Sequence, residues 1–186
     1  MLYGVGLKIL DDPNLSSTRA VRLVELPGAA IHALAAGDLG AANRAAPITL
    51  TPYFVAAESR STWRMRSAQV EACPSALGWI TRVVVDARLG IAVGRAGYHG
   101  PPDRGAMVEI GYAIDPTYRR QGYARAALVA LLGRATREPS VGTVRVTISP
   151  DNVASRTLVL QYGFVEVGEQ WDDEDGLETI FEVAAR

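Results

Sequence analysis

Cysteine is almost absent from this chain, since Cys73 is the only one among 186 residues. A single thiol cannot form an intrachain disulfide, and it excludes metal centres built from clusters of cysteines. Cys73 precedes a proline and lies far in sequence from both histidines, which favours a packing or surface thiol over a nucleophile. Such usage suits a reducing compartment, and we expect a cytoplasmic protein.

Long apolar runs and an excess of one charge are also missing. No uninterrupted stretch approaches the roughly 18 residues that a membrane-spanning helix needs. Lys8 and the Asp11-Asp12 pair give the first residues the wrong polarity for a secretory leader. The net charge is −1, so no overall positive field recruits nucleic acid or an anionic membrane surface. We therefore predict neither a nucleic-acid partner nor a membrane partner.

The composition that is present is that of an ordinary globular protein. Hydrophobic residues make up 48% and charged residues 21% of the chain. The length suits one domain. Residues 1–18 end in the turn-rich segment Pro-Asn-Leu-Ser-Ser-Thr, so we predict an N-terminal arm over residues 1–18 and a single domain over residues 19–186.

Hydrophobic periodicity predicts alternating strands and helices along this domain, hence an α/β fold. The predicted strands cover residues 19–26, 79–85, 91–98, 107–114, 143–148, 164–167 and 177–183. The predicted helices cover residues 29–36, 39–46, 53–71, 124–136 and 153–161, with Asp38 as a cap and Arg60, Arg64 and Arg66 facing outward. Aromatic and Met side chains at helical spacing suit core packing, with the lining of a substrate pocket as the alternative; they are Tyr53, Phe54, Trp63 and Met65.

The strongest local signal lies where the strand 107–114 passes into the helix that follows it. Asp115-Pro116 ends the strand, because proline cannot donate a hydrogen bond to a sheet. The first amides of a helix lack intrahelical acceptors and carry partial positive charge. Arg119 and Arg120 add two charges, and Gly122 allows the backbone to approach a phosphate closely. The pattern indicates an anion site, with a solvated, charged helix start as the alternative.

The order of residues in this loop resembles a known signature. Arg119-x-x-Gly122-x-Ala124, after a strand ending in Ile114-Asp115-Pro116, resembles the acyl-CoA signature of the GNAT superfamily of N-acetyltransferases. The segments 109–112 and 118–124 look most like the branch that acetylates the N-termini of ribosomal proteins. The resemblance implies that the loop amides hold the pyrophosphate of coenzyme A, and that backbone groups of Tyr112 and Ile114 bind its pantetheine arm.

A second segment carries the same resemblance. Asn152-x-x-Ser155-Arg156, followed by Tyr162-Gly163-Phe164, matches the other signature of the superfamily, in which the asparagine bonds the pantetheine arm. Asn152 can at the same time cap the helix that it precedes. The implied cofactor contacts are Tyr112, Ile114, Arg119, Arg120, Gln121, Gly122, Tyr123, Ala124 and Asn152.

One departure from the superfamily pattern concerns the proton donor. Many members carry a tyrosine seven residues after the asparagine, which protonates the leaving thiolate, and Val159 stands there in this chain. In the ribosomal branch a serine at the place of Ser155 has this role, and we carry it to Ser155 as the implied acid.

Glu109 is the implied general base, because a glutamate in this strand recurs in the superfamily. It shares a strand face with Gly111 and Ala113, small residues that leave room for a ligand. A base is needed because an alkylamine with a pKa of about 10.4 is neutral only about once in 10³ at neutral pH. A surface or ion-paired glutamate is the alternative. His99 stands in a loop, where it could also be a base, without a partner in view.

The resemblance implies a single GNAT domain with a mixed, mostly antiparallel sheet of about six to seven strands and about four helices. It implies acetyl transfer from acetyl-CoA to a primary amine, either a protein N-terminus or a small molecule, by direct attack and without a metal. A homodimer is compatible with it. The alternative is a non-catalytic acyl-CoA-binding or sensing domain, which the valine at position 159 favours. The acidic residues in 171–176 suit a solvated turn.

Overall fold

The computed structural model describes residues 19–173 and 176–186. The predicted N-terminal arm at 1–18 therefore lies outside the described residues, as do residues 174–175 of the acidic turn. Seven strands lie in the described part of the chain: β1 (Val21–Val24), β2 (Arg82–Asp86), β3 (Ala92–Tyr98), β4 (Met107–Ile114), β5 (Thr143–Ile148), β6 (Val165–Asp172) and β7 (Gly176–Ala184). They form one sheet in the order β1-β2-β3-β4-β5-β7-β6.

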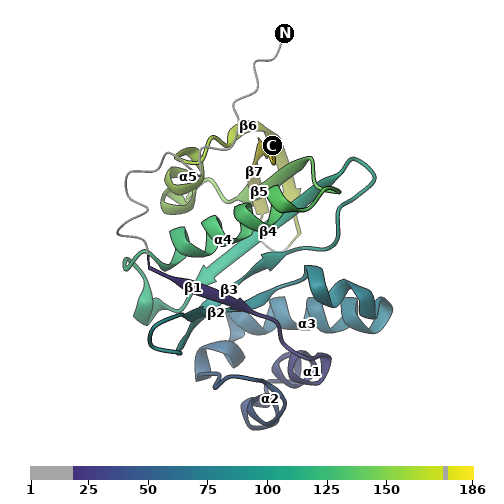
Figure 1. Cartoon of the computed structure of the whole chain (residues 1–186), viewed down its shortest axis with the longest axis vertical. Helices are drawn as coiled ribbons and strands as arrows, with labels where there is room; N and C mark the ends of the chain where they lie inside the picture. The colour runs from purple at the N-terminus through teal and green to yellow at the C-terminus, as the bar shows by residue number, and fades with distance from the viewer. Residues whose placement is uncertain (1–18, 174–175) are drawn as a thin grey trace.

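The sheet is mixed and mostly antiparallel, which confirms the predicted fold. Only the central β4–β5 pair among these strands is parallel. The described residues also form five α-helices, where the resemblance implied about four and the periodicity gave five ranges: α1 (Gly28–Ala36), α2 (Leu39–Ala45), α3 (Ala57–Ala72), α4 (Tyr123–Arg137) and α5 (Val153–Leu160). Figure 1 shows α1, α2 and α3 gathered beside β1–β3, with α4 and α5 away from them. No helix in the described ranges is long and apolar enough to cross a membrane.

Two buried clusters fill the two faces of the sheet. Consecutive residues of β2 belong to different clusters, because strand side chains point alternately to opposite faces. Val83 and Val85 pack in the cluster formed with α1 and α3, which holds Phe54 and Trp63. Val84 packs in the cluster formed with α4, β4 and β5.

Several local predictions are confirmed, and some are wrong. Asp38 caps α2, with its Oδ1 accepting from the Ala41 amide at 2.8 Å. Phe54 and Trp63 are fully buried, whereas Met65 is 54% exposed. Residues 79–81 are not strand, because a 3₁₀ helix (Pro74–Trp79) precedes β2. The strand predicted at 164–167 continues to Asp172 as β6.

Arg66 does not face outward as predicted, since it is only 4% exposed. Its Nε donates to Thr81 Oγ1 at 3.0 Å, and its Nη1 donates to Gln69 Oε1 at 3.0 Å and to the His99 carbonyl at 3.3 Å. These acceptors offset the cost of removing the guanidinium from water. Burial lowers the pKa of Arg66, and the charge of Glu109 acts against this shift.

The central strands part partway along their length. β4 pairs with β3 from Ile110 to Ile114. Its parallel pairing with β5 covers only Met107 to Glu109. The amide of His99 donates to the Glu109 carbonyl at 2.8 Å, and the Asp115 amide donates to Val93. Odd-numbered residues of β4 therefore bond toward β3, and by alternation the backbone groups of the even-numbered residues face the gap toward β5.

A buried carboxylate fastens the start of α4 to the sheet. Asp86 is 2% exposed at the end of β2. Its Oδ2 accepts from the Tyr123 hydroxyl at 2.7 Å and lies 3.7 Å from Arg19 Nη1. Its Oδ1 accepts from the amides of Arg88 and Leu89. The pKa of Asp86 lies below its ordinary value, chiefly because of the hydrogen bond from Tyr123.

We expect Tyr123→Phe to lower the free energy of unfolding at pH 7 by about 1.5–3 kcal/mol, the usual value for a hydrogen bond to a charged group. A carboxyl with a depressed pKa contributes stability above its unfolded pKa of about 3.9, and this contribution disappears as the pH falls through the folded pKa. The difference between Tyr123→Phe and wild type should therefore shrink at pH 3. Urea denaturation at both pH values measures it.

Tyr118→Phe is the matched control for this prediction, because Tyr118 packs edge-on against Tyr123 without a hydrogen bond to Asp86. It should leave the stability difference between the two pH values unchanged. Equal destabilisation by Tyr123→Phe at pH 7 and pH 3 would contradict the role assigned to the Asp86 charge.

Candidate functional site

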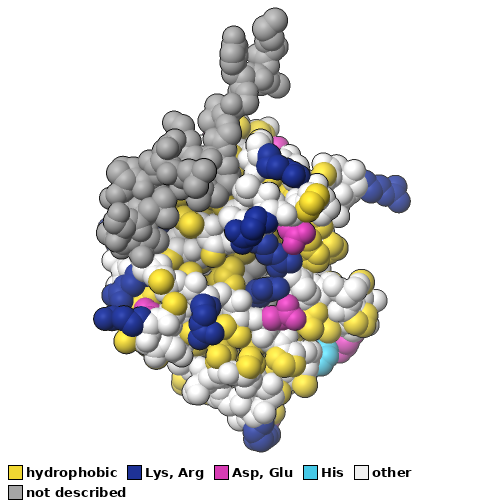
Figure 2. Space-filling view, viewed as in Figure 1, with side chains coloured by type: hydrophobic (Ala, Val, Ile, Leu, Met, Phe, Trp, Pro, Cys, Tyr) yellow, Lys and Arg dark blue, Asp and Glu magenta, His cyan; other side chains and the backbone are white. Residues whose placement is uncertain are grey.

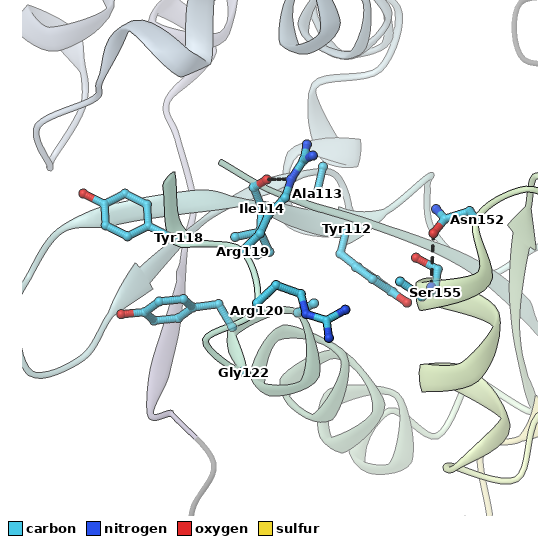
Figure 3. Close-up of a pocket in the computed structure, with 12 residues that line it drawn as sticks. Tyr112, Ala113, Ile114, Tyr118, Arg119, Arg120, Gly122, Asn152 and Ser155 are labelled. Atoms are coloured by element: carbon cyan, nitrogen blue, oxygen red, sulfur yellow. Dashed lines mark hydrogen bonds between the residues drawn. The ribbon is translucent and has the colours of Figure 1, made fainter. Parts of the chain in front are cut away.

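A cavity of about 440 Å³ lies between the end of β4 and the start of α4 (Figure 3). The first turn of α5 closes it on a third side. The residues that line it are Tyr112, Ala113, Ile114, Tyr118, Arg119, Arg120, Gly122, Tyr123, Ala124, Asn152, Ala154 and Ser155. Of the nine predicted cofactor contacts, only Gln121 does not line this cavity.

The start of α4 has the properties predicted for an anion site. Gly122 precedes the helix with a φ of +87°, a left-handed conformation that glycine adopts without a Cβ clash. It offers no side-chain cap, and the first turn holds no acidic residue. The Ala126 amide is the one that bonds the Gly122 carbonyl, at 3.0 Å. Tyr123 and Ala124, the first two residues of the helix, line the cavity, and amides at such positions attract negative charge.

The two arginines of the loop have different surroundings. Arg119 Nε donates to the Ile114 carbonyl at 3.1 Å, which holds the loop against the end of β4. Arg120 adopts a positive φ of 61°, and Figure 3 shows its side chain extending to the side of the cavity where Tyr112 and Ser155 lie. Arginine side chains are also spread over the face shown in Figure 2, although the whole chain is nearly neutral.

Two residues of the loop have side-chain roles that the sequence did not predict. The side-chain amide of Gln121 donates to the Thr117 carbonyl at 3.3 Å, and its oxygen lies 3.5 Å from Arg19 Nη2. Tyr123 lines the cavity while its hydroxyl is bonded to Asp86. A contact between Tyr123 and an anion therefore falls to its backbone amide.

Asn152, Ser155 and Tyr112 meet at the far end of the cavity (Figure 3). Asn152 Oδ1 accepts from the Ser155 amide at 3.1 Å, so the predicted cap of α5 is confirmed. Burial raises the pKa of Tyr112, and the neighbouring Ser155 side chain acts in the opposite direction. Within the described ranges, the buried Tyr112 hydroxyl lacks a hydrogen bond of ordinary geometry. A buried polar atom of this kind is normally paired, which suggests that a ligand completes it.

Val159 cannot replace the missing tyrosine. It lies on the face of α5 that packs into the core cluster, where it is fully buried. Tyr162 is also buried, and its hydroxyl accepts from Arg125 Nη1 at 3.1 Å.

A second cavity, of about 400 Å³, lies where β4 and β5 part. It is lined by His99, Ile110, Gly111, Tyr112, Val146, Thr147, Ile148, Ser149, Asn152, Ser155 and Glu178. Tyr112, Asn152 and Ser155 line both cavities. An extended ligand in the first cavity would therefore meet a second ligand beside these three residues.

Glu109 lies at the closed end of this gap. Its Oε1 accepts from Thr147 Oγ1 of β5 at 2.9 Å and lies 3.5 Å from His99 Nδ1. Its side chain is 23% exposed, and that of His99 is 45% exposed. Glu109 itself does not line either cavity, whereas Thr147 and His99 line the second one. The predicted base is therefore hydrogen-bonded to Thr147 and lies beside His99, next to the second cavity but outside its lining.

His99 is the residue that the sequence analysis undervalued. Its partner Glu109 is ten positions away in sequence but lies opposite it across β3 and β4, where backbone groups of the two residues are hydrogen-bonded. Extending the strand predicted at 91–98 by one residue and pairing it antiparallel with 107–114 is the signal that could have revealed the contact.

Comparisons with known proteins agree with this geometry. A family model described as acetyltransferase (GNAT) domain matches residues 34–165. The uncharacterized N-acetyltransferase YjdG of Bacillus subtilis is 33% identical over 73 residues, which are 39% of this chain and 44% of that protein. The match thus spans less than half the length of this relative.

Solved structures share the fold at low identity. RimL, a ribosomal alpha-N-protein acetyltransferase in complex with coenzyme A, has a TM-score of 0.61 at 16% identity, covering 89% of this chain and 94% of that one. Mutant forms of the spermidine/spermine N-acetyltransferase SpeG from Vibrio cholerae have a TM-score of 0.61 at 15% identity, with the same coverage of 89% and 94%. The fold therefore does not distinguish the predicted ribosomal branch from others.

Proposed function

Since the chain belongs to the acetyltransferase (GNAT) family, we propose that it transfers an acetyl group from acetyl-CoA to a primary amine. The acceptor is a protein N-terminus or a small-molecule amine, which attacks directly while both substrates are bound. The observation that carries this proposal is the meeting of two cavities at Tyr112, Asn152 and Ser155. One cavity has an anion site at its end, and the other opens where the strands part.

The residues of the first cavity suit coenzyme A. The uncapped start of α4 and Arg120 offer donors and positive charge to a diphosphate. The backbone groups of Ile110 and Tyr112 face the gap toward β5, where an extended pantetheine arm can bond them like an added strand. Ile114 offers mainly its amide, because its carbonyl already accepts from Arg119. The coenzyme A in the RimL structure supports this assignment.

Acetyl-CoA would supply the activated acyl group. In the transfer the amine nitrogen forms a bond to the acyl carbon, the bond from this carbon to sulfur breaks, and one proton leaves the nitrogen. A second proton must reach the thiolate sulfur. Holding the two reactants in line accounts for most of the expected acceleration, since this chemistry needs no covalent enzyme intermediate.

Proton transfer is assigned to the residues at the two ends of the second cavity. The cluster that contains Glu109 supplies the base at the closed end of the gap. Ser155 supplies the acid where the two cavities meet. It takes the role of the superfamily's tyrosine, whose position is occupied by Val159 in this chain. General acid and base groups of this kind typically contribute about 10²–10⁴-fold each.

Release of free thiol from acetyl-CoA, measured with a mixed panel of amines and N-terminal peptides, tests the proposal. Amine-dependent release supports transfer. Binding of acetyl-CoA without release across the panel would instead favour the non-catalytic binding domain, for which the buried Val159 is the supporting observation.

We expect Gly122→Glu to abolish measurable acetyl-CoA binding in isothermal titration calorimetry. A carboxylate at the start of α4 opposes the diphosphate, and the left-handed φ strains any side chain there. Gly90→Glu is the matched control, because Gly90 also has a positive φ, of 70°, with open space around it and no place in the cavity. Unchanged binding by Gly122→Glu would remove the basis for the cofactor site.

We expect Ser155→Ala to lower kcat by about 10²-fold or more, with acetyl-CoA affinity nearly kept, because the leaving thiolate loses its proton donor. Tyr112→Phe is the matched variant, since it removes the neighbouring hydroxyl and keeps the ring. Steady-state kinetics compare the two. If Tyr112→Phe causes this loss and Ser155→Ala does not, the acid is the phenol and Ser155 has been misassigned.

A further inference from the structure

We propose that His99 takes the proton from the attacking amine through its Nε2 atom, while Glu109 positions the ring. This assignment rests on the acetyl transfer proposed above and names the atom that acts as its base. His99 is thereby a catalytic residue, whereas Glu109 positions its ring and Thr147 holds Glu109 by a hydrogen bond.

The access of the two side chains to the acceptor cavity is the first argument. His99 lines the cavity, and Glu109 does not. Glu109 Oε1 already accepts a hydrogen bond from Thr147 Oγ1 at 2.9 Å, and it lies 3.5 Å from His99 Nδ1. An amine that enters the cavity therefore meets the imidazole before it meets the carboxylate.

The orientation of the ring is the second argument. Because Nδ1 faces Glu109, this nitrogen carries the hydrogen in the neutral tautomer that the carboxylate favours. The lone pair is then on Nε2. Nε2 lies over Gly111, where a Cβ would come within 3.0 Å of it. Gly111 lines the same cavity, so the basic atom lies at the cavity wall.

The backbone holds this arrangement in register. The amide of His99 donates to the Glu109 carbonyl at 2.8 Å, which makes the two residues cross-strand neighbours. The carbonyl of His99 accepts from Gln69 Nε2 at 2.8 Å and from Arg66 Nη1 at 3.3 Å. Residues of β4 and α3 thus fix the place of the histidine, although it follows the end of β3.

Three charged groups surround His99, and burial acts beside them. They are Glu109 of β4, Arg66 of α3 and, in the lining of the same cavity, Glu178 of β7. Desolvation lowers the pKa of His99, the charge of Glu109 raises it, and that of Arg66 lowers it, with a net fall. The imidazole is therefore available as a base above its lowered pKa.

The proton balance is closed by groups already named. The amine nitrogen gives its proton to Nε2 as the bond from nitrogen to the acyl carbon forms. The resulting imidazolium is stabilised by the Glu109 carboxylate, in the manner of a carboxylate that orients a histidine base. After the amide product leaves, the imidazolium returns the proton to solvent, and Ser155, which has given its proton to the thiolate, takes one back from solvent.

Kinetics of His99→Gln test the assignment, since glutamine keeps polarity and approximate length but does not titrate near neutral pH. We expect kcat to fall by about 10²–10⁴-fold with the dissociation constant for acetyl-CoA unchanged. In wild type, kcat should fall at low pH with a midpoint below the ordinary histidine value of about 6.5. This acid limb should vanish in His99→Gln.

The pH dependence of Glu109→Gln distinguishes a Glu109 that positions and charges the His99 ring from a Glu109 that only stabilises the fold. The carboxylate charge of Glu109 raises the pKa of His99. Its removal should therefore shift the acid limb of kcat to lower pH, and it should also reduce kcat. Titration of the His99 ring by NMR should give the same midpoint as the kinetics in wild type and the same shift in Glu109→Gln. This measurement does not depend on the folding of His99→Gln.

His32→Gln is the matched control, because His32 is the other histidine of the chain and bonds Ser67 at 2.7 Å, outside both cavities. It should leave kcat and the acid limb unchanged. If wild type is active and His99→Gln keeps the wild-type kcat or the acid limb, His99 is not the base. The proposed acetyl transfer itself would then still stand. A wild type that binds acetyl-CoA but releases no thiol with any amine overturns the transfer itself, and the role of His99 with it.

Discussion

The parallel pairing of β4 and β5 lasts for three residue pairs and stops at Glu109, and the site depends on this parting of the strands. Beyond Glu109 the backbone donors and acceptors on this side of β4 have no partners in β5, although they lie in the middle of a sheet, where such groups normally bond a neighbouring strand. A cavity occupies the gap, and residues of β4, β5, β7 and α5 line it together with His99, which follows β3. The Thr147 to Glu109 hydrogen bond ties the two strands at the point where they separate.

The proposed anion site depends on a different constraint, the left-handed backbone before α4. Gly122 turns the chain so that the first helix amides face the end of β4. The buried Asp86 holds Tyr123, the first residue of the helix, against β2. The loop and the parted strands are therefore linked through β4, which borders both cavities.

Local patterns in the sequence carried much of the fold and of the proposed cofactor site. The Gly122 loop, the Asn152 cap and the strand alternation of β4 are each set by neighbours within a few residues, so they could be predicted. Local patterns alone could not give the place of His99 or the burial of Arg66. Both depend on the register between β3 and β4 and on how α3 packs against them, which are contacts between residues distant in sequence.

The sharing of three residues between two otherwise separate cavities has a consequence for the evolution of this domain. Val146, Thr147 and Glu178 line only the second cavity, which we propose for the acceptor, and Arg119, Arg120 and Gly122 line only the first, which we propose for the acyl donor. If these roles hold, substitutions that line only the second cavity can change which amine is accepted without changing the contacts with the acyl donor. Tyr112, Asn152 and Ser155 lack this freedom, because a change at any of them alters both halves at once.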